Sequence, residues 1–305
     1  MGVDLAVKIG KLKLKNPVMV SSGTFGCGQQ YEELVDLKEL GAIVTKTITL
    51  QKRDGNKPPR IAETYAGMLN AIGLENEGLN YFCQTTLKYL NSLKTPSIIS
   101  VAGKDENDYC KLVKELDKLK VKAVELNISC PNVKSKKKYM FSQDAQATYK
   151  LVSRVRKLTK TTLIVKLTPN VTDIREIAKA AEDAGAEAVS LVNTFLGIAI
   201  DVNSRKPKLG NITGGLSGPA IKPLALRMVY EAASVLKIPI IGQGGIMSPE
   251  DGLEFIIAGA TAISIGTANF IEPQSAILIK NGIEKYLVKN KIKNIKLLRG
   301  TIKIS

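Results

Sequence analysis

The chain has 305 residues, of which 44% are apolar and 24% charged. These proportions are ordinary for a soluble globular protein, and no apolar run approaches the roughly 18 residues of a membrane span. The net charge of +16 comes mainly from lysines scattered over predicted helix surfaces. Without a basic stripe interleaved with aromatic residues, we expect neither nucleic-acid nor membrane binding. No secretory signal is recognisable, so a cytoplasmic protein is expected.

The predicted elements begin with a hairpin over residues 3–15, which turns at Gly10. Eight short apolar runs follow, each with a turn and a helical pattern after it. Such alternation indicates parallel strands buried on both faces. The runs cover residues 18–22, 42–47, 97–102, 123–127, 163–167, 188–193, 239–242 and 262–266. They predict a single (β/α)8 TIM-barrel domain over residues 1–305, with the hairpin at its amino end.

The connections between these units also carry signals. Helix starts are predicted at Asp105, Asp173 and Ser248, each an N-cap residue before a helical pattern. Residues 48–76 and 195–218 are too long for minimal βα loops. Long loops at the carboxyl ends of barrel strands are usually functional, so we expect insertions over that face.

The chain contains four cysteines and no histidine. The cysteines form no CxxC pair, so neither a zinc site nor any other metal site is expected. Cys83 and Cys110 lie in helix-like segments and are predicted to pack, and Cys27 in a glycine-rich turn is given a structural role. Cys130 differs, because it follows a buried strand in a polar turn, where strand ends position side chains over a pocket.

Small residues follow the seventh and eighth strands, at Gly244, Gly245, Gly266 and Thr267. Small side chains there allow backbone N–H groups to approach a phosphate, which is a recurrent barrel site. The alternative interpretation is a pair of tight turns. Because both positions carry the pattern, phosphate binding is favoured.

Lys46 and Lys166 end two otherwise apolar strands. A lysine there is unfavourable unless it meets an anion or a hydrogen-bond acceptor. Beside a phosphate site and a thiol, the pair indicates an anionic or electron-accepting cofactor. Aldolase-like chemistry remains open on these features alone.

Asparagines recur at positions 70, 127, 132 and 193. A cluster of amides can recognise a ligand with both donors and acceptors, such as a cyclic imide. Taken singly, each asparagine is more often a turn residue.

Three motifs carry a resemblance to a known family. Residues 67–74 read Gly-Met-Leu-Asn-Ala-Ile-Gly-Leu, 127–132 read Asn-Ile-Ser-Cys-Pro-Asn, and 213–220 read Thr-Gly-Gly-Leu-Ser-Gly-Pro-Ala. Nearly from end to end, the chain resembles the class 1 dihydroorotate dehydrogenases. The form of the first motif resembles the NAD-linked class 1B catalytic subunit. The resemblance implies an FMN-containing barrel that oxidises dihydroorotate to orotate in pyrimidine biosynthesis.

The resemblance also implies residue roles. Cys130 would take the C5 proton while hydride leaves C6 for the flavin N5. Lys166 would stabilise the reduced flavin, and Lys46 would contact both flavin and substrate. The residues that would hold one FMN per chain are Ser22, Lys46, Thr47, Ser100, Asn127, Lys166, Val192, Gly218, Gly244, Gly245, Gly266 and Thr267. Those that would line the substrate are Lys46, Asn70, Ala71, Ile72, Gly73, Leu74, Asn127, Asn132, Asn193 and Thr194.

A partner follows from the same resemblance. Because the chain has no cysteine cluster for its own iron–sulfur centre, electrons for NAD+ would leave through a subunit carrying FAD and an iron–sulfur cluster. The expected assembly is a homodimeric core within a heterotetramer.

Two departures from the family pattern stand out. Ser100 occupies a position where the family commonly has asparagine, so its flavin contact would need a bridging water. Residues 134–138 read Lys-Ser-Lys-Lys-Lys where the family carries a glycine-containing loop. This run either attracts the anionic substrate or is a solvated surface loop.

Other functions fit the same fold. A class 1A enzyme would use fumarate and need no partner. Another flavin barrel, such as a tRNA dihydrouridine synthase, would suit the basic charge, although no RNA-binding domain follows the barrel. A non-catalytic barrel that binds a phosphate-bearing ligand would leave Cys130 merely packed.

Overall fold

The computed structural model describes residues 2–129 and 141–303. Eight parallel strands close into a barrel in the order β10-β15-β16-β3-β4-β7-β8-β9. Each overlaps one predicted run, although β3, β4 and β10 end two or three residues earlier than predicted, so the (β/α)8 barrel is confirmed. The barrel strands are β3 (Val18–Val20), β4 (Ala42–Val44), β7 (Ser97–Val101), β8 (Ala123–Asn127), β9 (Thr162–Lys166), β10 (Ala188–Leu191), β15 (Ile240–Gln243) and β16 (Ala262–Ile265).

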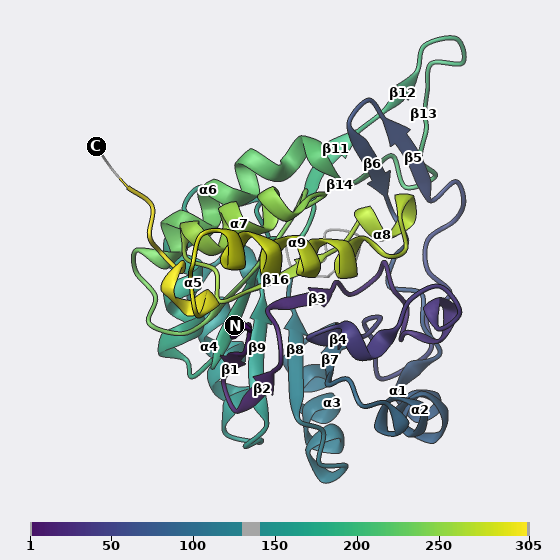
Figure 1. Cartoon of the computed structure of the whole chain (residues 1–305). Helices are drawn as coiled ribbons and strands as arrows, with labels where there is room; N and C mark the ends of the chain where they lie inside the picture. Colours follow the sequence, from purple (N-terminus) through teal and green to yellow (C-terminus); the bar gives the residue numbers. More distant parts are fainter. Residues whose placement is uncertain (1, 130–140, 304–305) are drawn as a thin grey trace.

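Helices cover the outside of the barrel (Figure 1). They are α1 (Gly78–Tyr81), α2 (Leu87–Ser92), α3 (Glu106–Lys118), α4 (Ala145–Arg156), α5 (Ile174–Asp183), α6 (Lys222–Ala233), α7 (Pro249–Ala258), α8 (Ala268–Ile271) and α9 (Ser275–Lys289), with a π-helical turn, η3 (Phe82–Thr86), joining α1 to α2. None of the described helices is both long and apolar enough to cross a membrane.

The three predicted helix starts are confirmed by their caps. The carboxylates of Asp105 and Asp173 accept hydrogen bonds from first-turn N–H groups of α3 and α5. Ser248 forms a capping box with Asp251 at the start of α7.

The crossover from β3 to β4 differs from the expected βα unit. It contains only two 3₁₀ turns, η1 (Gln29–Tyr31) and η2 (Leu37–Glu39). Gly23, Gly26 and Gly28 all adopt positive φ, which interrupts a right-handed helix.

The two long connections were predicted as loops, but they form strands. Residues 48–76 contain β5 (Ile61–Thr64) and β6 (Gly67–Asn70), and residues 195–218 contain β11 (Phe195–Ile198) and β14 (Thr213–Ser217). These four strands form one antiparallel sheet, β11-β14-β6-β5. A small hairpin, β12 (Ile200–Asp201) with β13 (Lys206–Pro207), projects beyond this insertion sheet at the top of Figure 1.

Glycines bring the two insertions together. A Cβ on Gly214 would lie 2.7 Å from the carbonyl oxygen of Asn70, and one on Gly215 would lie 2.0 Å from Thr194 Oγ1. Gly215 is paired with Asn70 in the ladder between β14 and β6. A larger residue at Gly214 would therefore press β14 away from β6, and one at Gly215 would displace Thr194.

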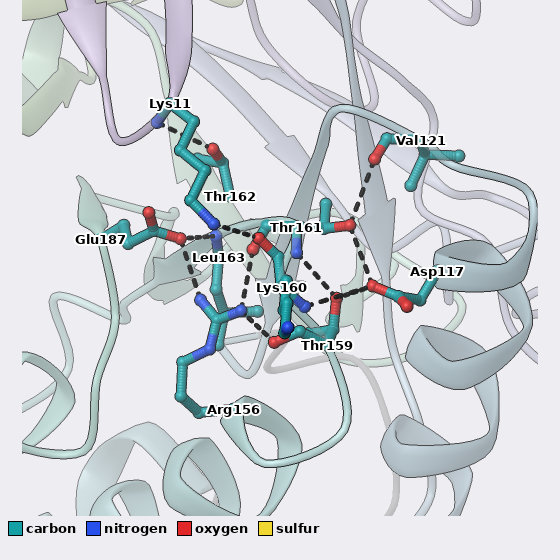
Figure 2. Close-up of polar contacts among 10 residues, drawn as sticks. All are labelled: Lys11, Asp117, Val121, Arg156, Thr159, Lys160, Thr161, Thr162, Leu163 and Glu187. Carbon is teal, nitrogen blue, oxygen red and sulfur yellow. Dashed lines mark hydrogen bonds and ion pairs between the residues drawn. The ribbon is translucent and has the colours of Figure 1, made fainter.

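The predicted amino-terminal hairpin is confirmed as β1 (Val7–Ile9) and β2 (Leu12–Leu14), with Gly10 at φ 55° in the turn. The backbone N–H of Lys11 donates to Thr162 Oγ1 at 3.0 Å. Since Thr162 is the first residue of β9, the hairpin lies at the amino end of the barrel (Figure 2).

A polar network around Asp117 and Arg156 joins the elements at this end of the barrel (Figure 2). The carboxylate of Asp117, on α3, accepts hydrogen bonds from the Thr159 hydroxyl, the Lys160 N–H and the Thr161 hydroxyl. Arg156, at the end of α4, donates to Glu187 at 2.9 Å and to backbone carbonyls of the 159–161 turn. The network fixes the turn that leads into β9.

Replacing Asp117 with asparagine is expected to lower stability in a pH-dependent way. Its hydrogen bond from Thr159 holds the pKa of this carboxyl below its usual value. A lowered folded-state pKa stabilises above the unfolded pKa of about 3.9, and that stability is lost as pH falls through the folded pKa. Because Asp117 is half-exposed, the expected loss at pH 7 is only about 1 kcal/mol.

Urea unfolding at pH 7 and pH 3 would measure this effect. The difference between wild type and Asp117→Asn should shrink at pH 3. The exposed Glu33→Gln is the control, and its difference should be small at both values. An Asp117→Asn difference that is equally large at pH 3 would contradict the assignment.

Candidate active site

A cavity of about 520 Å³ opens at the carboxyl ends of the barrel strands. Its wall combines the ends of β3, β4, β8, β9, β15 and β16 with residues of β5, β6 and β14 from the insertion sheet. The volume lies within the range of sites for cofactor-sized ligands.

Most of the predicted site residues line this cavity together. They come from positions as far apart as 22 and 267, and the barrel closure places them on one wall. They are Ser22, Lys46, Thr47, Asn70, Ile72, Gly73, Leu74, Asn127, Lys166, Val192, Asn193, Thr194, Gly218, Gly244, Gly245, Gly266 and Thr267.

Four predicted residues are not on the described wall. Cys130 and Asn132 lie outside the described residues. Ser100 is fully buried in β7, behind Thr47, and its hydroxyl bonds Thr47 Oγ1 at 2.9 Å. Ala71 is fully buried in the small apolar cluster beneath the insertion sheet. The side chains of Ser100 and Ala71 therefore lie in packed protein, and their predicted contacts with flavin and substrate stay predictions.

The side-chain ammonium groups of Lys46 and Lys166 line the cavity without a hydrogen-bond or ion-pair partner among residues 2–129 and 141–303. Lys166 is only 6% exposed. By contrast, Lys222 near the same face is paired with Asp251 at 2.7 Å and Glu254 at 3.0 Å. An unpaired ammonium in so buried a place is unfavourable, so the cavity suits an anionic or electron-rich ligand.

The glycines after β15 permit close packing of the backbone. Gly244 and Gly245 have φ of 122° and 74°. A Cβ on Gly245 would lie 2.7 Å from the backbone nitrogen of Lys222 and 2.9 Å from the carbonyl oxygen of Gly218. At Gly266 the nearest atom to a Cβ would be Ser21 Oγ at 3.7 Å, so that glycine leaves room within the cavity. This arrangement fits the predicted phosphate end of a cofactor site.

Gln243, the last residue of β15, is a wall residue that the sequence prediction missed. Its Oε1 accepts from Ser21 Oγ at 3.2 Å, whereas its buried Nε2 has no partner among the described residues. A polar side chain ending an apolar strand beside two glycines was the available signal. A bound ligand could accept a hydrogen bond from this amide N–H.

Further wall residues had been given no individual binding role. They are Ser21, Gly23, Thr24, Gly26, Gln30, Tyr31, Ile61, Met68, Glu75, Ser217, Ile221, Ile246, Met247 and Phe270. Several belong to the glycine-rich crossover after β3 and to the insertion sheet. These residues reach the wall because their segments fold back over the barrel, and a short sequence pattern does not predict that folding.

Two titratable groups near the cavity are held in their neutral forms. Burial raises the pKa of the Tyr31 hydroxyl, which donates to the carbonyl of Thr24 at 3.0 Å. Burial also raises the pKa of the Cys27 thiol, and the backbone N–H and charge of Lys46 offset this only in part. Cys27 is therefore a poor candidate for a reactive thiolate, in agreement with its predicted structural role.

Among the described residues, no group of His, Cys, Asp and Glu side chains could hold a metal ion. Apart from the carboxylate of Glu75, which pairs with Arg60 at 2.9 Å, the polar groups on the wall are ammonium, amide, hydroxyl and backbone groups. This donor set suits an organic ligand with acidic and carbonyl oxygens.

Comparison with known proteins identifies the family of this chain. The family model described as dihydroorotate dehydrogenase matches residues 4–287. A protein of Alkaliphilus metalliredigens named "Dihydroorotate dehydrogenase B (NAD(+)), catalytic subunit" is 50% identical over 300 residues, covering 98% of this chain and 99% of the relative. Proteins of the same name from Geotalea uraniireducens and Bacteroides thetaiotaomicron are 51% and 49% identical, with at least 98% of each chain covered. This chain therefore belongs to the dihydroorotate dehydrogenase family.

Proposed function

We propose that the chain is the catalytic subunit of an NAD+-linked dihydroorotate dehydrogenase, which oxidises dihydroorotate to orotate in pyrimidine biosynthesis. The observation that carries this proposal is the convergence of five side chains on one cavity. They are Lys46 and Lys166, whose ammonium groups are unpaired among the described residues, with Asn70, Asn127 and Asn193. Dihydroorotate has a carboxylate and a cyclic array of N–H and C=O groups. Lysine and amide side chains are complementary to both.

The proposed cofactor is FMN, one per chain, and the wall residues fit it. Gly244, Gly245 and Gly266 are partly exposed on the cavity wall, where their backbone could approach a phosphate. Lys166 and Gln243 Nε2, which has no partner among the described residues, offer donors to ring carbonyls. When bound, FMN supplies the acceptor for the hydride equivalent that leaves substrate C6.

The chain's own residues supply binding and proton transfer. Lys46 neutralises the substrate carboxylate, and Asn70 and Asn193 orient the ring through its donors and acceptors. Cys130, three residues beyond the end of β8, is the proposed base for the C5 proton. With no histidine in the chain, a thiolate is the remaining side chain suited to this step near neutral pH.

NAD+ reduction requires a second subunit in this proposal. The described cysteines, Cys27, Cys83 and Cys110, occur separately, and no site on the described part of the chain suits an iron–sulfur cluster. A partner carrying FAD and an iron–sulfur cluster would pass electrons from the catalytic cavity to NAD+. The proposed assembly is a homodimer of this chain flanked by two such partners.

The purified chain is expected to be yellow and to carry one FMN. Dihydroorotate should bleach the flavin absorbance of the isolated chain, and steady NAD+ reduction should appear only after the partner subunit is added. Turnover with fumarate in the absence of the partner would instead indicate the class 1A reaction. Bound FMN that dihydroorotate does not reduce would contradict the proposed activity and favour a ligand-binding barrel.

A further inference from the structure

Glu125 is a buried acidic residue at the centre of the barrel, in β8. The residue is 2% exposed, and no ion pair to it occurs within residues 2–129 and 141–303. Its Oε1 accepts from Ser100 Oγ at 3.1 Å, and its Oε2 accepts from Ser190 Oγ at 2.8 Å. Burial of a carboxylate with only two neutral donors is unfavourable, so the position calls for a functional explanation.

The Glu125 carboxylate determines the direction of a chain of hydrogen bonds. Glu125 accepts from a serine hydroxyl at both carboxyl oxygens, so the single hydroxyl hydrogen of Ser100 is used in its bond to Glu125. In the 2.9 Å contact between Thr47 and Ser100, Thr47 must then be the donor. Ser22, 3.0 Å from Thr47 Oγ1, must in turn donate to Thr47.

A second branch reaches the amides of the wall. Asn127 Nδ2 donates to Thr47 Oγ1 at 3.1 Å, so Thr47 accepts two hydrogen bonds and donates one. Ser129 Oγ donates to Asn127 Oδ1 at 3.0 Å, and Asn193 Nδ2 donates to Ser129 Oγ at 2.9 Å. Every donor in both branches points toward Glu125. The orientation of each amide and hydroxyl is thereby fixed.

We infer that Glu125, acting through Ser100 and Thr47, is a positioning residue that sets the hydrogen-bond polarity of the cavity wall. The Ser22 hydroxyl donates its only hydrogen to Thr47 Oγ1. Its oxygen can therefore only accept a hydrogen bond from a ligand. Asn127 is held with its Nδ2 toward Thr47, so its amide cannot flip. The inference rests on the proposed function for the identity of the ligands, FMN and orotate.

The inference also accounts for Ser100, where the family commonly has asparagine. Its hydroxyl lies behind Thr47 and connects the wall to the carboxylate, without facing the ligand itself. Ser190 makes an equivalent bond to the other carboxyl oxygen, but within the described ranges its hydroxyl bonds no residue of the cavity wall. The two serines therefore form a matched pair for an experiment.

Ser100→Ala and Ser190→Ala should each be compared with wild type in FMN titration of the apoprotein and orotate titration of the FMN-loaded chain. Urea unfolding of each apoprotein would measure stability. Both variants remove one hydrogen bond to Glu125 and should lose similar stability. Ser100→Ala should also weaken orotate or FMN binding about 5- to 10-fold, as expected for one broken hydrogen-bond chain, whereas Ser190→Ala should change it less than about 2-fold.

Equal ligand affinities in the two variants would overturn the inference and leave Glu125 a structural residue. Glu125→Gln provides an independent check. The glutamine side chain has the same shape as glutamate, but its NH2 group can donate to Ser100, so the hydrogen bonds from Thr47 to Ser100 and onward no longer have one fixed direction. It should weaken binding as Ser100→Ala does, and wild-type affinity in this variant would also overturn the inference. Failure of the wild-type chain to bind FMN at all would count against the proposed function.

Discussion

Cys130→Ser is expected to reduce the rate of dihydroorotate oxidation by about 10²- to 10⁴-fold at pH 7, the usual contribution of a positioned general base. A serine hydroxyl is far more basic when ionised and is almost fully protonated at this pH, so it accepts the C5 proton poorly. FMN content should be unchanged. The measurement is the single-turnover rate of flavin bleaching by dihydroorotate in the isolated chain.

The pH dependence of the same rate separates a base from a packing residue. In the wild-type chain, the rate should rise with pH as the thiol ionises, from a free-thiol pKa of about 8.5 or lower. In Cys130→Ser, that rise should disappear below pH 9. Cys83→Ser is the matched control, since Cys83 lies in the π-helical turn between α1 and α2 and does not line the cavity. Wild-type rates in Cys130→Ser would remove the thiol from the mechanism.

Lys166→Met should slow flavin reduction by about 10²- to 10³-fold, the usual effect of removing one charge that stabilises a developing anion. At the same time, the apoprotein should become about 1 kcal/mol more stable or stay unchanged. Lys166 is 6% exposed and unpaired among the described residues, and methionine fills a similar volume without burying a charge. Stopped-flow bleaching and urea unfolding would measure the two effects.

Lys179→Met is the control for the loss of a positive charge. Lys179 lies on α5 and pairs with Glu182 at 2.7 Å and Asp183 at 2.9 Å, on the helical surface of the barrel. Flavin reduction should be unaffected in this variant. A Lys166→Met chain that reduces flavin normally but is strongly destabilised would show that the lysine has a structural role.

The barrel was predictable because its signals are local. Strands such as β8 and β9 are buried along their full length, which requires near-continuous apolar runs in the sequence. The caps at Asp105 and Ser248 act within three residues of themselves. The insertion sheet was not predictable in this way. Its central pairing joins Asn70 to Gly215, and no local pattern identifies a partner 145 residues away.

Site residues were predictable only where the residue type alone indicates an unusual environment. Lys46 and Lys166 were found because a lysine at an apolar strand end is unfavourable by itself. Ser100 was predicted to contact flavin only through a bridging water, and in the structure its hydroxyl lies between Thr47 and Glu125. That depth depends on the register of β7 against β8, which pairs Ser100 with Glu125. Register between neighbouring strands is a tertiary property.

The insertion sheet has a consequence for engineering the enzyme. Loops at the carboxyl face of a barrel are commonly exchanged one at a time to change specificity. Here β6 from one insertion pairs with β14 from the other, and Thr267 Oγ1 donates to Ser217 Oγ at 2.8 Å, which links the sheet to β16. Replacing either insertion alone would leave the other with an unpaired edge. The two segments can be transplanted only as a single module, although most of a barrel half separates them in the gene.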